Sequence, residues 1–410
     1  MKVMMLCGFL HQGAGKYFGR TDDNGGGWIS GMINGLKNSS GIELYYAAFE
    51  KGEDNSVSKA SSDGVEYSLV TYKDSSYACS YLRQTGCDVY HLFGAENPFV
   101  QDILAGIPFD KTLVYIQGLI SEYYYHYKAG YDLYSPASPL FSKYIDLNAN
   151  MFRERGKTEI EVFRQAKFIA GRTDWDHAFL LKHHLDAVYY HLDETLRAPF
   201  YTAETWSPEC MEPHTIYVTQ ANYPIKAAHM VAEMLKILRQ SYPDVRCLIS
   251  GENLMKAQSP ATKLGVSYAS HIRKLIRRYG LENSMIYIGE QDTESVISHM
   301  QNANVFLSPS SIENSSNSLQ EAMLIGTPCV SSYVGGLNTI VSSPDQCLMY
   351  PFDDPMLGAY QIARIFDDKE LAVSLSEKGS RRIRYLADPE KNAKQLTGIY
   401  RDMYSRIQHK

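Results

Sequence analysis

The sequence predicts an α/β fold made of two doubly wound parallel-sheet domains. Short apolar runs rich in Val, Ile, Tyr and Phe alternate with helical patterns along most of the 410 residues, which is typical of repeated strand–helix units on parallel sheets. The runs form two series, and three prolines within Pro199–Pro213 interrupt any regular pattern between them. At about 150 residues per domain, the length agrees with two to three domains. We therefore expect domains at residues 1–205 and 206–387.

The first series begins with an apolar segment that is too short to span a membrane and runs into a Gly-rich stretch. A buried first strand explains this segment better than a signal peptide. The expected strands of this half are Val3–Cys7, Leu44–Phe49, Tyr67–Thr71, Val89–Phe93, Leu113–Ile116, Phe168–Ala170 and Ala187–Tyr190. Between two of them, the Ser-, Asp- and Lys-rich stretch Lys51–Gly64 predicts a mobile surface loop.

The second series starts near Ile216 and repeats the same pattern. The expected strands are Ile216–Thr219, Cys247–Ser250, Met285–Ile288, Val305–Ser308, Cys329–Ser332 and Leu348–Tyr350. In the helix after the first of them, apolar residues at helical spacing predict one buried face, formed by Val231, Met234, Leu235 and Leu238. The last stretch, 388–410, predicts a helix with the apolar side Leu396, Ile399, Tyr400 and Met403. No strand follows this helix, so we expect it to pack back on the first domain.

Composition excludes several classes of protein. Apolar residues make up 44% and charged residues 21% of the chain, which argues against wholesale disorder. Forty Lys and Arg against 46 Asp and Glu give a net charge of −6, which argues against a dedicated nucleic-acid-binding protein. Seven Cys without a Cys-x-x-Cys pair favour a reducing cytoplasm over a disulfide framework or a zinc ribbon. Because no run of eighteen apolar residues occurs, we expect a cytoplasmic protein, at most one that lies peripherally on the inner face of the membrane.

The most informative segment is Ser308–Met323. An expected strand ends at its start, a polar turn follows, and a helix is predicted over Ser318–Ile325. Glu313 falls in the turn and Glu321 in the helix. The small polar residues between them leave backbone N–H groups unbonded at a helix amino terminus, where an anionic group is favoured. Each carboxylate can accept two hydrogen bonds from a vicinal diol, so the pattern fits a nucleotide-sugar, with its ribose diol, diphosphate and hexose diol.

Seven residues separate the two glutamates, and the sequence continues with Gly326-Thr327-Pro328-Cys329-Val330 and Gly335-Gly336-Leu337. This pattern resembles the retaining glycosyltransferases of the large family four, the glycosyl transferases group 1. The resemblance covers both halves of the chain and is most specific over residues 305–337. It implies the GT-B architecture, in which two Rossmann-like domains face each other across a cleft.

The resemblance also implies a donor site. A hexose would move from a nucleotide-sugar, with UDP the favoured nucleotide, and no cofactor or metal would be needed. Glu313 would hold the hexose hydroxyls and Glu321 the ribose diol. Further donor contacts are expected from Asn314, Ser315, Asn317, Ser318 and Leu319. The departing phosphate oxygen would take the proton of the attacking hydroxyl, so the protein mainly supplies positive charge and N–H donors at the diphosphate.

A run of three glycines, 25–27, precedes a helical pattern near the amino terminus. Members of the family place a Gly-rich turn here, so we expect Gly26 and Gly27 to contact the donor, because Gly lets the backbone approach a phosphate. The structural alternative is a flexible turn. The upstream stretch Gly13–Lys16 lacks the remaining residues of a P-loop, and the chain lacks the Gly pattern of a dinucleotide-binding dehydrogenase.

The cations at the diphosphate depart from the family pattern. Many members have an Arg six residues before a Lys; here Lys226 matches the Lys, but Gln220 replaces the Arg. Gln220 and Asn222 remain expected donor contacts. Arg172 is the candidate for the second cation, and the alternative is a structural Arg paired with Asp174 or Asp176.

A His that contacts the transferred sugar in many members is also missing. Gln117 stands at that position, after the strand expected at Leu113–Ile116, and can hydrogen-bond a hydroxyl but cannot act as a base. His91 and His126 are candidate acceptor contacts, although a lone His is more often structural. The other His residues lack the spacing of a zinc site.

Tyr occurs 31 times against 15 Phe and 3 Trp. Seven tyrosines fall within 115–134: Tyr115, Tyr123, Tyr124, Tyr125, Tyr127, Tyr131 and Tyr134. Aromatic faces stack on sugars, and Tyr with Lys suits a membrane headgroup layer, so Tyr123 and His126 are the expected acceptor contacts. The alternative is an aromatic-rich helix packed within the domain.

The expected function is retaining hexosyl transfer from a UDP-sugar to a glycan acceptor, lipid-linked, in bacterial capsule, exopolysaccharide or O-antigen assembly, with no nucleic-acid partner. A nucleotide-sugar epimerase or hydrolase of the same architecture and a non-catalytic glycan-binding relative remain alternatives. The second of these would be expected to have lost one of the two glutamates, and both are present.

Overall fold

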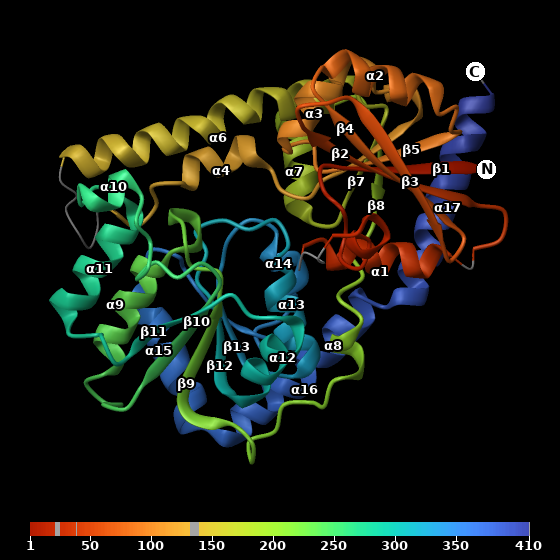
Figure 1. The fold of residues 1–410 in the computed structure, drawn as a ribbon. Helices are drawn as coiled ribbons and strands as arrows, with labels where there is room; N and C mark the ends of the chain where they lie inside the picture. The colour runs from red at the N-terminus through yellow and green to blue at the C-terminus, as the bar shows by residue number, and fades with distance from the viewer. Residues whose placement is uncertain (21–24, 38, 132–138, 410) are drawn as a thin grey trace. The chain divides into compact units, whose positions relative to one another are not determined.

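The computed structural model describes residues 1–20, 25–37, 39–131 and 139–409, which form two compact units (Figure 1). Unit 1 consists of Met1–Ser121, Arg153–Ala198 and Leu386–Lys410, and unit 2 of Glu122–Phe152 and Pro199–Tyr385. The division differs from the expected boundaries mainly in residues 122–152, which pack with unit 2.

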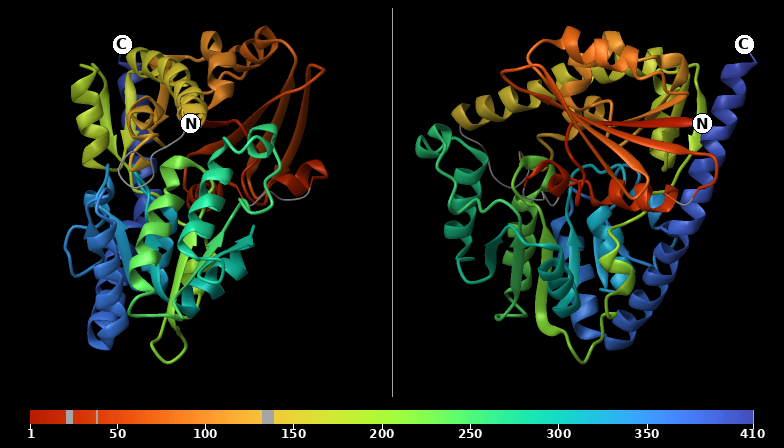
Figure 2. Two further views of the ribbon diagram at one scale, coloured as in Figure 1. Left: turned by 90° about the vertical axis from the view of Figure 1, so that its left-hand side faces the viewer. Right: turned by 45° about the vertical axis from the view of Figure 1, so that its right-hand side comes forward.

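Unit 1 is built on an eight-stranded sheet with the order β3-β4-β2-β1-β5-β6-β7-β8. All neighbouring strands pair in parallel except β3 and β4, which are antiparallel. The twist of this sheet is visible in Figure 2, where its first strands are red and orange. The strands are β1 (Lys2–Cys7), β2 (Glu43–Lys51), β3 (Ser56–Ser62), β4 (Val65–Tyr72), β5 (Val89–Phe93), β6 (Thr112–Tyr115), β7 (Phe168–Gly171) and β8 (Val188–His191).

Strand β3 corrects the expectation of a surface loop over Lys51–Gly64. Its residues are Ser, Val, Lys and Ala, and most of them are exposed, so neither apolar alternation nor β propensity reveals a strand. The strand forms because its backbone pairs with β4, from Ser56 opposite Thr71 to Ser62 opposite Val65. A polar, Lys-containing sequence is typical of an edge strand, which must not attract a further strand.

Helices cover the sheet of unit 1. They are α1 (Gly27–Leu36), α2 (Ser75–Gln84), α3 (Pro98–Ile103), α7 (Asp174–Lys182) and α17 (Pro389–Gln408), with short 3-10 turns at Gly15–Phe18, Leu104–Gly106 and Phe109–Lys111. Two more, α4 (Ile120–His126) and α6 (Pro139–Gln165), cross from one unit to the other.

The last helix, α17, belongs to unit 1 and packs against α1 and β5. Asp388 caps its amino terminus by accepting a hydrogen bond from the N–H of Lys391. The apolar side expected from the sequence, Leu396, Ile399, Tyr400 and Met403, is buried in the core of this unit. Burial of this face is what holds the helix to the sheet, because helices in proteins gain most of their stability from tertiary packing.

Unit 2 is built on a six-stranded parallel sheet with the order β11-β10-β9-β12-β13-β14. The strands are β9 (Glu212–Thr219), β10 (Arg246–Ser250), β11 (Met285–Gly289), β12 (Ala303–Ser308), β13 (Cys329–Ser332) and β14 (Leu348–Tyr350). In chain order this is 3-2-1-4-5-6, the doubly wound arrangement in which the winding direction reverses between the first and fourth strands.

The helices of unit 2 are α8 (Pro199–Thr202), α9 (Ala228–Leu238), α10 (Pro260–Lys263), α11 (Tyr268–Tyr279), α12 (Thr293–Asn302), α13 (Asn317–Ile325), α14 (Leu337–Ile340), α15 (Pro355–Asp367) and α16 (Lys369–Leu386), with a 3-10 turn at Pro224–Lys226. The expected apolar face of α9 is buried, and the remaining residues of this helix are buried too, except Lys236 and Ile237.

Residues 122–152 pack on unit 2 through aromatic rings. Tyr131 stacks on His229 of α9 with 4.4 Å between ring centroids, and Phe141 stacks on His271 of α11 at 4.7 Å. His229 Nε2 also lies 3.0 Å from the carbonyl oxygen of Ala129. Local sequence patterns do not indicate these contacts, because they join segments about 100 or more residues apart.

Candidate active site

The loops that follow β9 and β12 meet at the switch point of the unit 2 sheet. The two strands are neighbours, with Val305 opposite Ile216 and Phe306 opposite Tyr217. Ligands of open α/β sheets bind outside the carboxyl ends of the strands at such a point. Lys226 follows β9 and Glu313 follows β12, so the topology itself brings the two most important residues expected from the sequence to one place.

Lys226 and Glu313 form an ion pair at this edge. The Lys226 Nζ contacts Glu313 Oε1, and the side chains are 20% and 10% exposed. Ser310 donates a second hydrogen bond to the same carboxylate oxygen at 2.7 Å. The other oxygen, Oε2, has no hydrogen bond to any residue in the described ranges, so it is available to hydroxyl groups of a ligand.

Lys226 keeps its charge in this environment. Burial lowers its pKa, but the Glu313 carboxylate and the Tyr223 phenol raise it more, so the net pKa lies above the ordinary value of a lysine. A protonated Lys226 is therefore present at neutral pH, and an anionic group that enters the site meets a fixed positive charge.

Gly335 and Gly336 hold the backbone of Glu313. The N–H of Gly336 donates to the Glu313 carbonyl at 3.0 Å. Gly335 has φ +51°, and a Cβ added there would lie 2.0 Å from the same carbonyl oxygen. Only glycine fits this close approach, which explains in physical terms why the Gly-Gly pair accompanies Glu313.

The helix α13 begins directly after the Glu313 loop. Ser316 caps it, since its Oγ accepts from the N–H of Leu319 at 3.3 Å. The N–H of Leu319 is therefore already bonded, which corrects the expectation that it contacts the donor. Asn317 Oδ1 is buried and has no hydrogen-bond partner among the residues that the structure describes. A buried acceptor of this kind at a helix amino terminus is suited to accept a hydrogen bond from a ligand.

The other expected donor contacts surround this helix terminus. Asn314, Ser315 and Glu321 are buried, and Ser318 is partly exposed. Gln320 donates to the Oγ of Ser315 at 2.9 Å and fixes that hydroxyl. Glu321 lies on α13 beneath the loop, as the sequence predicts.

Gln220 and Asn222 lie in the loop after β9. Gln220 is exposed and has φ +50°, a left-handed conformation that is uncommon for a residue other than glycine. The Nδ2 of Asn222 donates to Glu252 at 3.1 Å. Both residues lie on the edge that carries Lys226.

A hollow of about 780 Å³ adjoins the Glu313 loop within unit 2. The loop itself contributes Ser311 and Ile312, and the loop after β13 contributes Tyr333 and Gly335. His126 lines the other side, and its carbonyl oxygen accepts from the Oγ of Ser311 at 3.0 Å. Burial lowers the pKa of His126, with the charge of Glu122 opposing this in part, so its imidazole is neutral at pH 7.

In unit 1, the Gly-rich turn is required by packing. Gly26 caps α1 with φ +68°, and a Cβ there would lie 2.6 Å from the Phe9 ring. A Cβ on Gly27 would lie 2.4 Å from Arg197. The glycines therefore bring the start of α1 against its neighbours, a reason for glycine that requires no ligand.

Arg172 is a buried residue that supports Gln117. Its Nη1 lies 3.1 Å from Glu194 and donates to the Ile116 carbonyl at 2.9 Å, while Nη2 donates to the Gln117 carbonyl at 3.3 Å. Arg172 is therefore a structural arginine in an ion pair, which was the alternative considered from the sequence. The partner of its guanidinium is Glu194 rather than Asp174 or Asp176. Asp176 instead accepts from the backbone N–H of Arg172 at 2.7 Å. A guanidinium held in this way positions the Gln117 backbone and is not available to a diphosphate.

Gln117 follows β6 at the carboxyl edge of the unit 1 sheet. Its Nε2 is buried without a hydrogen-bond partner among the residues that the structure describes. A polar side chain fixed at its backbone and unsatisfied at its amide is suited to bind a hydroxyl group.

His91 is a core residue, and the expectation that it contacts an acceptor is wrong. Its side chain is fully buried, stacks on Phe93 at 4.1 Å, and shares a hydrogen bond of 2.7 Å with the Tyr400 hydroxyl of α17. Burial lowers its pKa to about 3. The ring joins the last helix to β5.

The tyrosines of the tyrosine-rich segment 115–134 differ in burial. Tyr115, Tyr127 and Tyr131 are buried, whereas Tyr123 and Tyr124 are partly exposed and Tyr125 is 70% exposed. Tyr134 lies outside the described residues. The packing alternative is thus correct for three of these tyrosines, whereas Tyr123, Tyr124 and Tyr125 are at least partly exposed.

Ser310 and Glu194 were not among the site residues expected from the sequence, and Gly335 was expected only as part of the motif that follows Glu321. Ser310 lies three residues before Glu313, so its contact could have been found from local spacing. Glu194 is separated from Arg172 by α7 and β8, and no sequence pattern connects them.

Membrane spans and metal sites were both among the features considered for the described ranges of the chain, and neither occurs there. No helix in those ranges is both long and apolar enough to cross a membrane. Over the same residues, no three His, Cys, Asp or Glu side chains gather as a metal site would require.

The fold is shared with solved structures over nearly the whole chain. Sucrose-phosphate synthase from Thermosynechococcus elongatus matches with a TM-score of 0.68 and 18% identity, covering 99% of this chain and 100% of that one. The Anabaena protein HepE, in complex with UDP and glucose, matches with a TM-score of 0.68 and 12% identity, covering 97% and 99%. The chain therefore has the GT-B fold of two Rossmann-like parallel-sheet domains, as expected from the sequence.

The sequence match is more local and falls on unit 2. Residues 208–382 match the family of glycosyl transferases group 1. The D-inositol 3-phosphate glycosyltransferase of Corynebacterium urealyticum is 26% identical over 182 residues, which is 44% of this chain and 41% of that protein. The chain thus spans about two fifths of this curated relative. The matched range contains Lys226, Glu313 and Glu321.

Proposed function

We propose that the protein is a retaining glycosyltransferase that moves a hexose from a UDP-sugar to a glycan acceptor without a bound metal ion. The observation that carries this proposal is the Lys226–Glu313 pair at the switch point of unit 2, next to the amino terminus of α13. The family match over this region and the UDP and glucose bound to HepE support the choice of donor.

Each residue has a role in the proposed reaction. Glu313 Oε2, which has no hydrogen bond within the described residues, accepts hydrogen bonds from hexose hydroxyls, and buried Glu321 accepts from the ribose diol. Lys226 and the N–H groups at the start of α13 stabilise the negative charge that develops on the diphosphate as it leaves. The acceptor hydroxyl attacks the anomeric carbon on the face that the nucleotide leaves, and the departing phosphate oxygen takes its proton.

We further propose that the acceptor is a lipid-linked glycan of bacterial surface polysaccharide assembly. Exposed Tyr125 and partly exposed Tyr123 supply amphipathic rings for a sugar or headgroup layer. Cosedimentation with anionic vesicles at low salt tests the membrane part, and a protein that stays in the supernatant would contradict it.

The donor is tested with a panel of nucleotide-sugars, scored by thermal shift and by release of free nucleotide. A donor at 100 times its Kd stabilises the protein by about 2.7 kcal/mol, so the true donor gives the largest shift. We expect a UDP-sugar. Release of nucleotide that needs no acceptor would instead indicate a hydrolase, and a change in the sugar of the recovered nucleotide-sugar would indicate an epimerase.

Glu313→Gln and Lys226→Met test the site directly. Each removes one charge of the pair while nearly keeping side-chain size, and we expect transfer to fall at least about a hundredfold, the cost typical of losing one electrostatic contact to the transition state. Glu209→Gln is the matched control, since Glu209 forms an exposed ion pair with Lys369 in the same unit. Near-wild-type turnover in Glu313→Gln or Lys226→Met would refute the site. Proton NMR of the new glycosidic bond tests retention, and activity in excess EDTA tests metal independence.

A further inference from the structure

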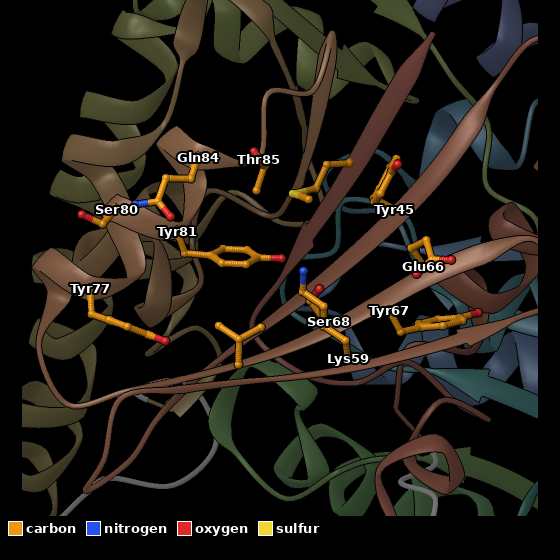
Figure 3. A pocket seen from close by; sticks show the side chains of 12 residues that line it. Tyr45, Lys59, Glu66, Tyr67, Ser68, Tyr77, Ser80, Tyr81, Gln84 and Thr85 are labelled. Carbon is orange, nitrogen blue, oxygen red and sulfur yellow. The ribbon is translucent and has the colours of Figure 1, made fainter.

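Unit 1 contains a cavity that the proposed reaction does not use. It has a volume of about 550 Å³ and lies between α2 and one face of strands β1 to β4 (Figure 3). This volume falls in the range of small-molecule sites in proteins.

The cavity exists because one crossover helix is missing. The parallel neighbours β2 and β4 are joined through the antiparallel strand β3, whereas parallel neighbours are usually joined by a helix that covers the sheet. On this face α2 packs against β4, and an open stretch remains between the helix and residues of strands β1 to β4. The cavity is therefore a consequence of the strand that the sequence did not reveal.

One face of α2 forms the first wall. Tyr77, Ser80, Tyr81 and Gln84 are spaced three, four and seven residues from the first, so they lie side by side on the helix. Tyr77 and Tyr81 are partly exposed, and Figure 3 shows both reaching from α2 toward the strands.

The strands form the opposite wall with residues that the sheet register brings together. Tyr45 of β2 lies opposite Glu66 of β4, and Lys59 of β3 lies opposite Ser68 of β4. With Tyr67 of β4, the wall thus offers two tyrosines, one serine hydroxyl and two charges of opposite sign.

This chemistry matches a neutral carbohydrate. The rings of Tyr45, Tyr77 and Tyr81 provide flat apolar faces for sugar rings, and Ser68 and Gln84 provide hydroxyl and amide partners for sugar hydroxyls. The positive charge of Lys59 and the negative charge of Glu66 sum to zero, so the lining of the cavity has no excess positive charge to attract a phosphate. An anionic ligand such as a nucleotide is disfavoured for this reason.

The cavity also lies away from the edge at which the expected site residues gather. Gln117 follows the carboxyl end of β6, and ligands of open sheets bind outside carboxyl ends. Tyr45 and Ser68 instead lie in the first half of their strands. The cavity is therefore a separate site on unit 1.

We propose that this cavity binds a neutral oligosaccharide, as a second point of attachment for the glycan acceptor at a distance from the reacting hydroxyl. The role as an acceptor contact rests on the proposed function, whereas the binding of a neutral glycan does not. A second attachment point raises the effective concentration of a polymeric acceptor at the enzyme.

The test is binding of the full-length protein to an array of neutral hexose and N-acetylhexosamine oligosaccharides, printed beside sialylated and sulfated ones. We expect binding to neutral glycans. Tyr77→Ala removes a stacking face and should weaken that binding about tenfold, which corresponds to the loss of one aromatic contact and its buried area. Ser80→Arg places a long side chain into the cavity from an exposed helix position, so it blocks the site without removing a core residue. Tyr360→Ala, at a tyrosine that is 60% exposed on α15 of unit 2, is the matched control.

The outcomes separate this proposal from the proposed function. Neutral-glycan binding that is lost in Tyr77→Ala and Ser80→Arg and kept in Tyr360→Ala supports the cavity, whether or not UDP stabilises the protein. Absence of neutral-glycan binding, binding that both cavity variants keep, or preference for the acidic glycans overturns it. If UDP stabilises the wild-type protein but not Glu313→Gln in the same preparations, the donor site stands even when the cavity proposal fails.

Discussion

Replacement of Gly335 by alanine tests whether the backbone of Glu313 must be held by the Gly-Gly pair. The variant adds one methyl group at a position with φ +51°, where its carbon would lie 2.0 Å from the Glu313 carbonyl oxygen. No side-chain atom of Lys226, Glu313 or Glu321 is changed. Any loss of function would therefore come from displacement of the loop.

The magnitude follows from the geometry. Non-bonded heavy atoms prefer separations of about 3.5 Å, so the Glu313 carbonyl or the Gly335 backbone must move by about 1.5 Å. Such a movement breaks the 3.0 Å hydrogen bond from Gly336 to Glu313, which costs about 1 kcal/mol. The left-handed backbone adds about 1–2 kcal/mol for a residue with a Cβ. Misplacement of a reacting group by about 1 Å typically costs about a hundredfold in rate, so we expect at least that loss in transfer.

The assay is steady-state transfer together with the thermal shift produced by UDP. Gly280→Ala is the control, because Gly280 ends α11 with φ +65° and an added Cβ would have only Arg239 Nη1 near it, at 3.5 Å. It carries the same backbone penalty without contact with the site. We expect a larger loss of stability in Gly335→Ala, by about the 1 kcal/mol of the broken hydrogen bond, and a loss of turnover in Gly335→Ala alone. Full turnover in Gly335→Ala, or equal losses of turnover in both, would refute the reasoning.

Three further predictions concern unit 1. Arg172→Ala should lower the free energy of unfolding by about 3–5 kcal/mol in urea titrations, because it removes the cation of a buried ion pair; a change below about 1 kcal/mol would contradict the contribution of this pair. Burial lowers the pKa of native His91 to about 3, while the unfolded chain takes up a proton near pH 6.5, so native stability falls as the pH drops through this window. His91→Phe should remove about 2 kcal/mol of the loss measured between pH 7 and pH 5, and an unchanged pH dependence would count against the core assignment. Deletion of residues 387–410 should prevent unit 1 from folding, since α17 buries four large side chains worth about 1.5–3 kcal/mol each; an unchanged circular dichroism melting curve would rule this out.

The fold was predictable where local pattern and tertiary structure agree. Every expected strand coincides with an observed one to within a few residues, because parallel strands are buried on both faces and form apolar runs in the sequence; the edge strand β3 was expected as a loop. Strand β3 is polar because it is exposed at an edge, and the sequence of an exposed strand resembles that of a loop. The helix α17 was predictable because its apolar side repeats at helical spacing.

The site was predictable in part for the same reason. Glu313 and Lys226 follow strands that neighbour each other in any doubly wound sheet, so topology alone brings them together. The partner of Arg172 was not predictable, because Glu194 approaches it only through tertiary packing. The burial of His91 depends on Tyr400, which lies 309 residues away in the chain. Spacing in the sequence carries no information about contacts of this kind.

The tyrosine surplus has a different meaning once the two units are known. Tyr127 and Tyr131, two members of the tyrosine-rich segment, are buried in unit 2, and Tyr131 stacks there on His229. A ring that is buried against protein cannot also stack on a sugar. The tyrosines that combine a half-open ring with neighbouring hydroxyl and amide groups are instead Tyr77 and Tyr81, in the cavity of unit 1. Glycan recognition by this chain, if it uses tyrosine, is therefore expected to depend on the helix beside the irregular edge of the first sheet more than on the segment with the most tyrosines.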